Sequence, residues 1–236
     1  MKRSNEPHTD AYSADNVGAR RSGLRDGTAA HRDRHEISYS DEIKRKALHL
    51  LALVIPLGMW LAGNTVSLIV LGSLAAVALV ADFLRARSER FARAIYRYFA
   101  LLMRPEECPP MDGPIVLNGA TWVILSALLL VALFPIEVAV ASFTTFMIAD
   151  AAAAVVGRGL GRRRWPRTSR TVEGSSAFFV AGLTVMLIFG WTPLWISIIA
   201  VLAGTAAEIP SGPLNDNIRV PLVIGLVIYA SQLITF

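Results

Sequence analysis

Long apolar segments alternate with short polar ones along the chain after residue 46. The apolar segments cover residues 47–63, 65–81, 115–134, 136–156, 175–191, 193–207 and 220–236. Most of them approach the ~17–25 residues that a helix needs to cross a bilayer. Their apolar residues are continuous rather than alternating, which favours helices over a membrane β-barrel. The pattern predicts an all-α polytopic membrane protein with about seven transmembrane helices.

The basic residues fall on one side of this predicted arrangement. The 23 Lys and Arg residues lie in the segment that ends at Lys46, in residues 85–113, in residues 157–174 and at Arg219. With seven spans, all of these regions face the same side of the membrane. The positive-inside rule makes that side cytoplasmic. We therefore expect a cytoplasmic N-terminus and an active site that faces the cytoplasm. A short chain without a secretory signal also favours a plasma (cytoplasmic/inner) membrane location.

Two polar segments do not fit the spanning pattern. Residues 1–36 hold few large apolar side chains and predict a disordered N-terminal tail, which leaves residues 37–236 as the integral membrane domain. Residues 84–104 place apolar side chains and arginines on opposite faces of a helix. This pattern predicts one interfacial amphipathic helix. We interpret it as an anchor to anionic lipid or as a guide for a lipid substrate.

Composition agrees with a membrane protein and narrows the function classes. Of the 236 residues, 54% are hydrophobic and 17% are charged, against about 25% charged in an ordinary soluble domain. Cys108 is the only cysteine, so a disulfide scaffold is excluded and a zinc site is disfavoured. The pI of about 9.8 is explained by basic cytoplasmic loops, so we expect no nucleic-acid partner.

Ionisable and amide side chains near the ends of the predicted spans are the first functional candidates, because such groups are costly at membrane depth. All of them except the outer Glu137 fall on the predicted cytoplasmic side, which indicates one polar site. These candidates are Glu42, Arg45, Lys46, His49, Asp82, Asn118, Asp150 and Glu208. Transport would instead predict polar groups near the midplane and on both sides.

Two short motifs lie between the fourth and fifth spans. The first, Gly157 to Gly161 with Arg158, combines glycines that permit close backbone approach with an arginine that binds phosphate oxygens. The second, Arg170 to Ser175, contains a base, a hydroxyl, an acid and a glycine, a set that can hold a phosphate and a metal-bound oxygen. A glycine-rich helix cap and a capping threonine are the plain structural alternatives.

A third polar motif, Asn215-Asp216-Asn217, lies between the sixth and seventh spans. It is either a polar turn or, with Glu208 and Asp150, a source of oxygen ligands. Mg²⁺ prefers one or two carboxylates together with substrate phosphates. The chain has no GxxxxGK[ST] motif, so a P-loop is excluded.

In this order, the motifs resemble those of the dolichol kinase, phytol kinase and CTP-dependent diacylglycerol kinase family over roughly residues 40–236. Arg170 to Ser175 is the most specific element. The resemblance implies a polyprenol kinase-like membrane enzyme that transfers the γ-phosphate of a nucleotide, usually CTP, to an isoprenoid alcohol or diacylglycerol. The family usually has Lys where this chain has Arg170, and some phytol kinases carry a second acid where this chain has Ala154.

On this resemblance we expect roles for the candidate residues. Catalytic roles are expected for Asp150, Glu173 and Asp216, and Mg²⁺ binding for Asp150, Glu208 and Asp216. Nucleotide binding is expected for Arg45, Lys46, Gly157, Arg158, Gly161, Arg170, Thr171, Gly174 and Asn217, and a further polar role for Glu42, His49 and Asn118. Glu173 either orients the metal or acts as base on the lipid hydroxyl.

The expected partners are a lipid alcohol, a nucleoside triphosphate and the bilayer. The identity of the lipid, the choice among CTP, UTP and ATP, and the oligomeric state stay open at this point. Two other functions also stay open. One is phosphatidate cytidylyltransferase-like synthesis of a CDP-lipid, which would release pyrophosphate. The other is a non-catalytic or transport function.

Overall fold

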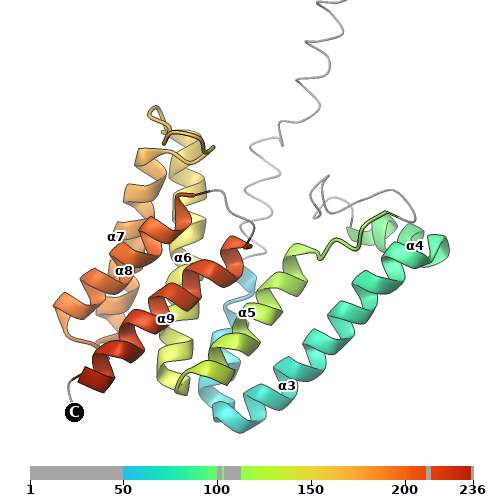
Figure 1. Cartoon of the computed structure of the whole chain (residues 1–236), viewed down its shortest axis with the longest axis horizontal. Helices are drawn as coiled ribbons and strands as arrows, with labels where there is room; N and C mark the ends of the chain where they lie inside the picture. Colours follow the sequence, from blue (N-terminus) through green and yellow to red (C-terminus); the bar gives the residue numbers. More distant parts are fainter. Residues whose placement is uncertain (1–49, 100–102, 104–112, 211–213, 235–236) are drawn as a thin grey trace, which may run out of the picture. The chain divides into compact units, whose positions relative to one another are not determined.

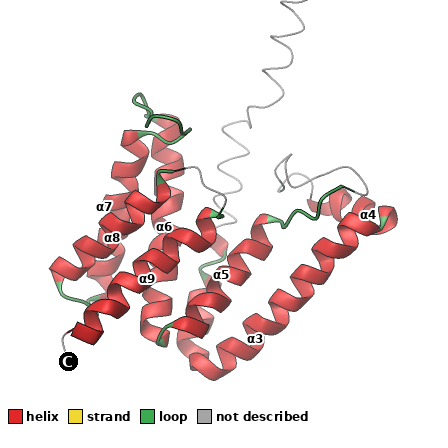
Figure 2. Cartoon of the chain, in the orientation of Figure 1, coloured by secondary structure: helices red, strands yellow, loops and turns green. Residues whose placement is uncertain are grey.

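The structure is a computed structural model that describes residues 50–99, 103, 113–210 and 214–234, all within one compact unit, Tyr39–Phe236. The predicted tail, residues 1–36, lies outside the described residues. The described residues form helices, and their β-structure is limited to a single bridge between Arg164 and Thr171 (Figures 1 and 2). The helices are α3 (Val54–Arg87), α4 (Glu89–Phe99), α5 (Gly119–Leu133), α6 (Ile136–Gly159), α7 (Val172–Phe189), α8 (Leu194–Glu208) and α9 (Asp216–Ile234).

Four of these helices, α3, α6, α7 and α9, are long and apolar enough to cross a membrane, and α5 and α8 are shorter apolar helices. Large apolar side chains are exposed along much of α3, which a soluble protein rarely allows over a continuous surface. These features indicate a membrane protein and confirm the all-helical class. The number of spans and the side of the N-terminus stay predictions.

The helix α6 lies at the centre of the packing. It contacts α3, α5, α7 and α9. Of its most apolar 18-residue stretch 72% is buried, against 22% for α3. Phe143, Phe146 and Met147 are among the largest fully buried side chains. Because α6 also carries Asp150, the core fixes the position of that carboxylate.

The first helix, α3, changes direction sharply at Gly63. Gly63 has a φ of 72° and a ψ of −179°, a conformation that favours glycine. The Ser67 hydroxyl donates to the Met59 carbonyl at 3.4 Å, although eight residues of straight helix would span ~12 Å. Residues 54–63 and 65–81 of the two predicted segments therefore form two arms of α3, which Figure 1 shows meeting at the lower end. Residues 47–49 lie outside the described residues.

Three predicted boundaries need correction. The amphipathic helix was expected over 84–104, but Leu84 belongs to α3 and α4 covers Glu89–Phe99. The break falls at Ser88, whose hydroxyl accepts from the Phe91 N–H at 3.4 Å, as a capping serine does. The last helix begins at Asp216, one turn before the predicted 220.

The third correction concerns Asn118, which was expected one turn inside its span. It is the N-cap of α5 instead, and its side chain accepts from the Thr121 N–H. Asparagine is among the preferred residues at this position because its oxygen satisfies an unpaired helix donor. The polar side chain therefore stands at the start of the helix.

The helix ends sort by charge. In Figure 1, the ends formed by the last residues of α3, α6 and α8 and the first residues of α5, α7 and α9 lie toward the top. Among the described residues, the charged side chains belong to these ends, to α4 and to the loop before α7, with two exceptions. Glu137 lies in the first turn of α6, and Asp150 lies nine residues before the end of α6. The polar candidates that the structure describes therefore gather at one end of the helices, and the cytoplasmic orientation of this end stays a prediction.

Candidate functional site

Charged side chains from separate segments meet at this end. Arg170 Nη1 lies 2.7 Å from Glu208 Oε1, and Arg170 Nη2 lies 2.5 Å from Asp216 Oδ2. The other oxygen of Asp216 lies 2.5 Å from Arg219 Nη2. Asp150 acts electrostatically on Arg170 from α6. We call these five residues the Arg170 cluster.

The loop before α7 fixes the backbone of Arg170. The Trp165 N–H donates to the Arg170 carbonyl at 3.0 Å, and the Val172 N–H donates to the Arg163 carbonyl at 2.8 Å. These bonds make a short antiparallel hairpin. The Trp165 indole N–H donates to the Ser175 hydroxyl at 3.1 Å, which ties the hairpin to the first turn of α7.

The two paired carboxylates lie at opposite kinds of helix end. Glu208 is the last residue of α8, and only 2% of its side chain is exposed. Asp216 is the first residue of α9, where the helix dipole favours a negative charge. The Asn215 side chain accepts from the Asn217 N–H at 2.9 Å and so caps this turn.

Electrostatics hold Arg170 firmly in its charged form. Burial by itself would lower the pKa of the Arg170 guanidinium, but Glu208, Asp150 and Asp216 together raise it above its ordinary value. Arg170 therefore keeps its charge, as arginine side chains in proteins do. Partly buried charges of this kind need partners, and the cluster supplies them.

A second polar group, which we call the Asp82 cluster, joins α3 to α5. The Asp82 carboxylate accepts from Arg85 Nη2 at 3.0 Å, from the Asn118 N–H at 3.0 Å, from Asn118 Nδ2 at 2.9 Å and from the Thr121 hydroxyl at 2.7 Å. Arg85 also donates to the Val116 carbonyl at 2.6 Å. Asn118 therefore belongs to this clamp between α3 and α5 and not to the Arg170 cluster.

The three predicted phosphate-binding glycines are packed around Thr171. A Cβ at Gly161 would lie 2.1 Å from the Gly157 carbonyl oxygen, and a Cβ at Gly157 or Gly174 would lie 2.9 Å from Thr171 Oγ1. Thr171 is the N-cap of α7 and accepts from the Gly174 N–H at 3.1 Å. Close packing of the end of α6 and of the residues after it around Thr171 therefore explains why these positions are glycine, and nucleotide binding at them stays a prediction.

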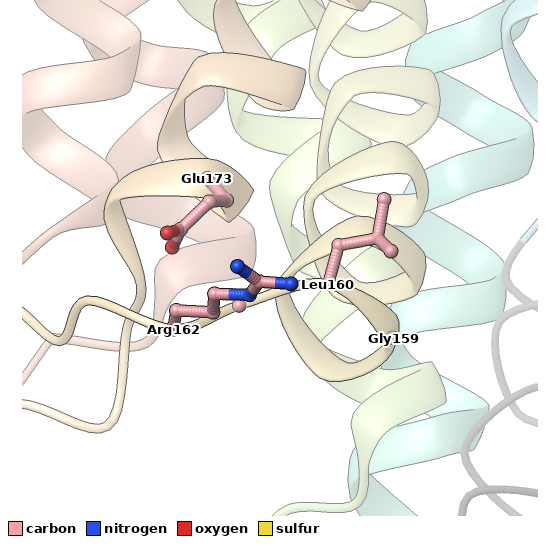
Figure 3. A pocket seen from close by; sticks show the side chains of 5 residues that line it. Gly159, Leu160, Arg162 and Glu173 are labelled. Carbon is pink, nitrogen blue, oxygen red and sulfur yellow. The ribbon is translucent and has the colours of Figure 1, made fainter.

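Glu173 stands beside a pocket of about 360 Å³ between the end of α6 and the start of α7. Its carboxylate accepts from the Arg163 N–H at 3.3 Å. The Glu173 and Arg162 side chains both reach the pocket (Figure 3). The lining residues are Gly159, Leu160, Gly161, Arg162 and Glu173. The pocket offers a carboxylate and a guanidinium close to Arg170 in the chain.

The carboxylates of the Arg170 cluster have the donor chemistry that Mg²⁺ prefers. The described part of the chain holds no group of three His, Cys, Asp or Glu that could bind a metal by itself. Both oxygens of Asp216 and one of Glu208 contact arginines. A site that uses one or two carboxylates and completes its ligands with phosphates fits these residues.

The remaining predicted residues divide into two groups. Arg158 is exposed in the last turn of α6, and Asn217 follows Asp216 in the first turn of α9. The second group lies outside the described residues, and its predicted roles are untested. It consists of Glu42, Arg45, Lys46 and His49.

Three residues at the site were missed from the sequence: Arg162, Trp165 and Arg219. A signal existed for Arg219, because it follows Asp216 by three residues, a spacing that brings helical side chains together. Arg162 and Trp165 gave no comparable signal, since their positions depend on the fold of the loop before α7.

Two known proteins are similar to the chain. An uncharacterized protein of Rickettsia prowazekii is 28% identical over 188 residues, which cover 77% of this chain and 90% of that protein. CTP-dependent diacylglycerol kinase 1 of Schizosaccharomyces pombe is 27% identical over 215 residues, which cover 81% of this chain and 94% of the kinase. No family model matches the chain, and no solved structure matches it significantly.

Proposed function

We propose that the protein is an integral membrane lipid-alcohol kinase that takes the γ-phosphate from CTP. The observation that carries this proposal is the Arg170 cluster. Its carboxylates and arginines come from α6, from the loop before α7, from the end of α8 and from the start of α9. The similarity to a CTP-dependent diacylglycerol kinase over 94% of that enzyme supports the same class.

The proposed reaction transfers one phosphoryl group. The hydroxyl oxygen of the lipid forms a bond to the γ-phosphorus, and the bond from that phosphorus to the β,γ-bridging oxygen breaks. CDP leaves with the electron pair, and the hydroxyl proton is lost to a base. Such a reaction depends on positioning and charge neutralisation more than on covalent chemistry, which suits a site built from paired charges.

Each part of the cluster has a proposed role. Arg170 would neutralise phosphate charge, because a guanidinium binds phosphate oxygens in a bidentate manner. Asp150, Glu208 and Asp216 would hold Mg²⁺. When bound, this ion would neutralise charge that develops on the phosphate oxygens.

Other residues would complete the nucleotide and lipid sites. Glu173, beside its pocket, would accept the proton of the lipid hydroxyl or orient the metal-binding groups. Arg45, Lys46, Arg158 and Asn217 would add contacts to the nucleotide. The lipid would be an isoprenoid alcohol or diacylglycerol, presented at the charged end of the bundle.

Labelled CTP tests this proposal. Purified full-length protein in detergent with Mg²⁺ would receive γ-labelled or α-labelled CTP and a panel of phytol, polyprenol, diacylglycerol and phosphatidate. We expect label from the γ position in an organic-soluble product. Label only from the α position would establish a cytidylyltransferase. Absence of transfer from CTP, ATP and UTP would leave a non-catalytic or transport function.

A further inference from the structure

Arg219 has contacts that a simple positive flank of a membrane span does not need. Its Nη2 lies 2.5 Å from Asp216 Oδ1 and donates to the Pro210 carbonyl at 2.7 Å. Its Nε is buried with no hydrogen-bond acceptor among the described residues. A buried N–H donor of a charged group that lacks an acceptor is rare in folded proteins, and its usual explanation is a ligand or an ordered water.

The pairing within the Arg170 cluster poses a chemical problem for a kinase. The residues that should face phosphate, Arg170 and Arg219, contact the residues that should face a cation, Glu208 and Asp216. Asp216 stands between the two arginines, with one oxygen on each. In this arrangement the ion pairs balance the charges of both kinds of group without any ligand, although Arg219 Nε still lacks an acceptor among the described residues.

We propose that Arg219 is a second phosphate-binding residue, and that Glu208 and Asp216 hold Arg170 and Arg219 in place until a nucleoside triphosphate and a divalent cation bind together. This inference rests on the proposed function. Both arginines then turn from carboxylate to phosphate oxygens, and the carboxylates face the cation. The exchange keeps every charge paired, whereas removal of one partner alone would leave a partly buried charge uncompensated.

Exposure permits this exchange at the surface side of the cluster. The side chains of Arg170 and Asp216 are 30% and 34% exposed, and that of Arg219 is 17% exposed. Glu208, at 2%, forms the buried floor. A triphosphate that approaches from solvent would therefore reach Arg170 and Asp216 first.

The exchange predicts opposite changes in the affinity for the triphosphate and in the affinity for the cation alone. With three carboxylates and two arginines, the cluster binds a cation weakly while both arginines are in place. Removal of the Arg219 charge should weaken binding of the triphosphate and strengthen binding of the cation alone, since Asp216 then lacks one partner. A purely structural tie between α9 and the loop after α8 would instead affect both ligands in the same direction.

The experiment uses full-length protein in nanodiscs. Equilibrium dialysis measures α-labelled CTP binding with Mg²⁺, and electron paramagnetic resonance measures Mn²⁺ binding without nucleotide. Arg219→Gln is compared with wild type and with Arg219→Lys, which keeps the charge. Arg97→Gln is the matched control, because Arg97 is an exposed arginine on α4. Thermal unfolding of each variant reports its stability.

We expect Arg219→Gln to weaken CTP binding by about tenfold or more, the effect of losing one charge-assisted hydrogen bond, and to tighten Mn²⁺ binding. Arg219→Lys should change both less, and Arg97→Gln neither. If wild type binds CTP but Arg219→Gln leaves both affinities unchanged, or weakens both with a lower Tm, the exchange is wrong and the kinase proposal stands. If wild type binds none of CTP, UTP and ATP, the proposed function itself fails.

Discussion

The Asp82 cluster and the Arg170 cluster lie at the same end of the bundle but differ in how their carboxylates are satisfied. Asp82 is 1% exposed and accepts from backbone, amide, hydroxyl and guanidinium donors. Asp216 is 34% exposed, and its carboxylate contacts two arginines. One carboxylate is enclosed by mostly neutral donors on two helices, and the other belongs to accessible ion pairs.

This difference separates a structural clamp from a candidate ligand site. Neutral donors on the backbone and on short side chains cannot move far, so the Asp82 cluster fixes α3 against α5. Arginine side chains are long and can exchange partners without a change in the fold. The comparison teaches that a polar residue near a membrane span is a functional candidate only after its partners are known.

The largest expected effect is on catalysis in the Arg170 cluster. Asp150→Asn keeps the volume of a buried side chain in the central helix but removes its charge. We expect the variant to insert and fold, while transfer of γ-phosphate to lipid falls by about 10²–10³-fold, as for loss of one electrostatic group in an active site. Steady-state label transfer measures the effect, and wild-type turnover in the variant would remove Asp150 from the mechanism.

A substitution in the Asp82 cluster should lower the stability of the folded protein. Asp82→Asn removes the ion pair between Asp82 and the buried Arg85, and breaking a buried ion pair costs about 3–5 kcal/mol. We expect a clear fall in the Tm of the detergent-solubilised protein. The control is Glu89→Gln, because Glu89 pairs with Arg93 in an exposed bridge that contributes about 0–1 kcal/mol. Equal shifts for the two variants would contradict the clamp.

A smaller effect tests how the loop of the Arg170 cluster is held. Gly161→Ala would place a Cβ 2.1 Å from the Gly157 carbonyl oxygen, so backbone must shift. We expect a loss of about 1–3 kcal/mol, typical of overpacking, together with weaker CTP binding. Gly72→Ala on α3, where a Cβ would meet nothing within 4 Å, is the control. A neutral Gly161→Ala would show that this packing is not needed.

The smallest effect concerns α4, which follows the Asp82 cluster in the chain. Its arginines Arg90, Arg93 and Arg97 are exposed, and each basic residue near an anionic surface contributes about 1 kcal/mol. We expect hydrogen exchange of residues 89–99 to be slower in nanodiscs with phosphatidylglycerol than in phosphatidylcholine alone. Replacing the three arginines with Gln should remove this difference. The same protection in both lipids would argue against an electrostatic anchor.

Much of the fold was predictable from the sequence because lipid-facing helices need continuous apolar runs. The apolar runs predicted most boundaries of α5 to α9 to within one helical turn. They did not show that Ser88 ends α3 or that Asn118 caps α5. Capping depends on one side chain and on a local backbone angle, so an average over an apolar run does not detect it.

The residues of the candidate site were easier to predict from the sequence than the way in which they pair. Asp150, Arg170, Glu208 and Asp216 stood out because charge is rare near membrane spans. Their pairing joins segments up to 46 residues apart, which only the packed helices bring together. Arg219 was counted among the basic residues that orient the spans, because arginine serves both as an orientation signal and as a phosphate-binding residue.

The most direct test of the central claim is transfer of label from γ-labelled CTP to lipid by wild type and by Asp216→Asn, with the Tm of both proteins measured in the same detergent. We expect labelled lipid with wild type, and little label with Asp216→Asn although the variant remains folded. Equal labelling by both folded proteins would contradict the assignment of the Arg170 cluster as the active site. A wild-type protein that labels no lipid with any nucleotide would contradict the kinase itself.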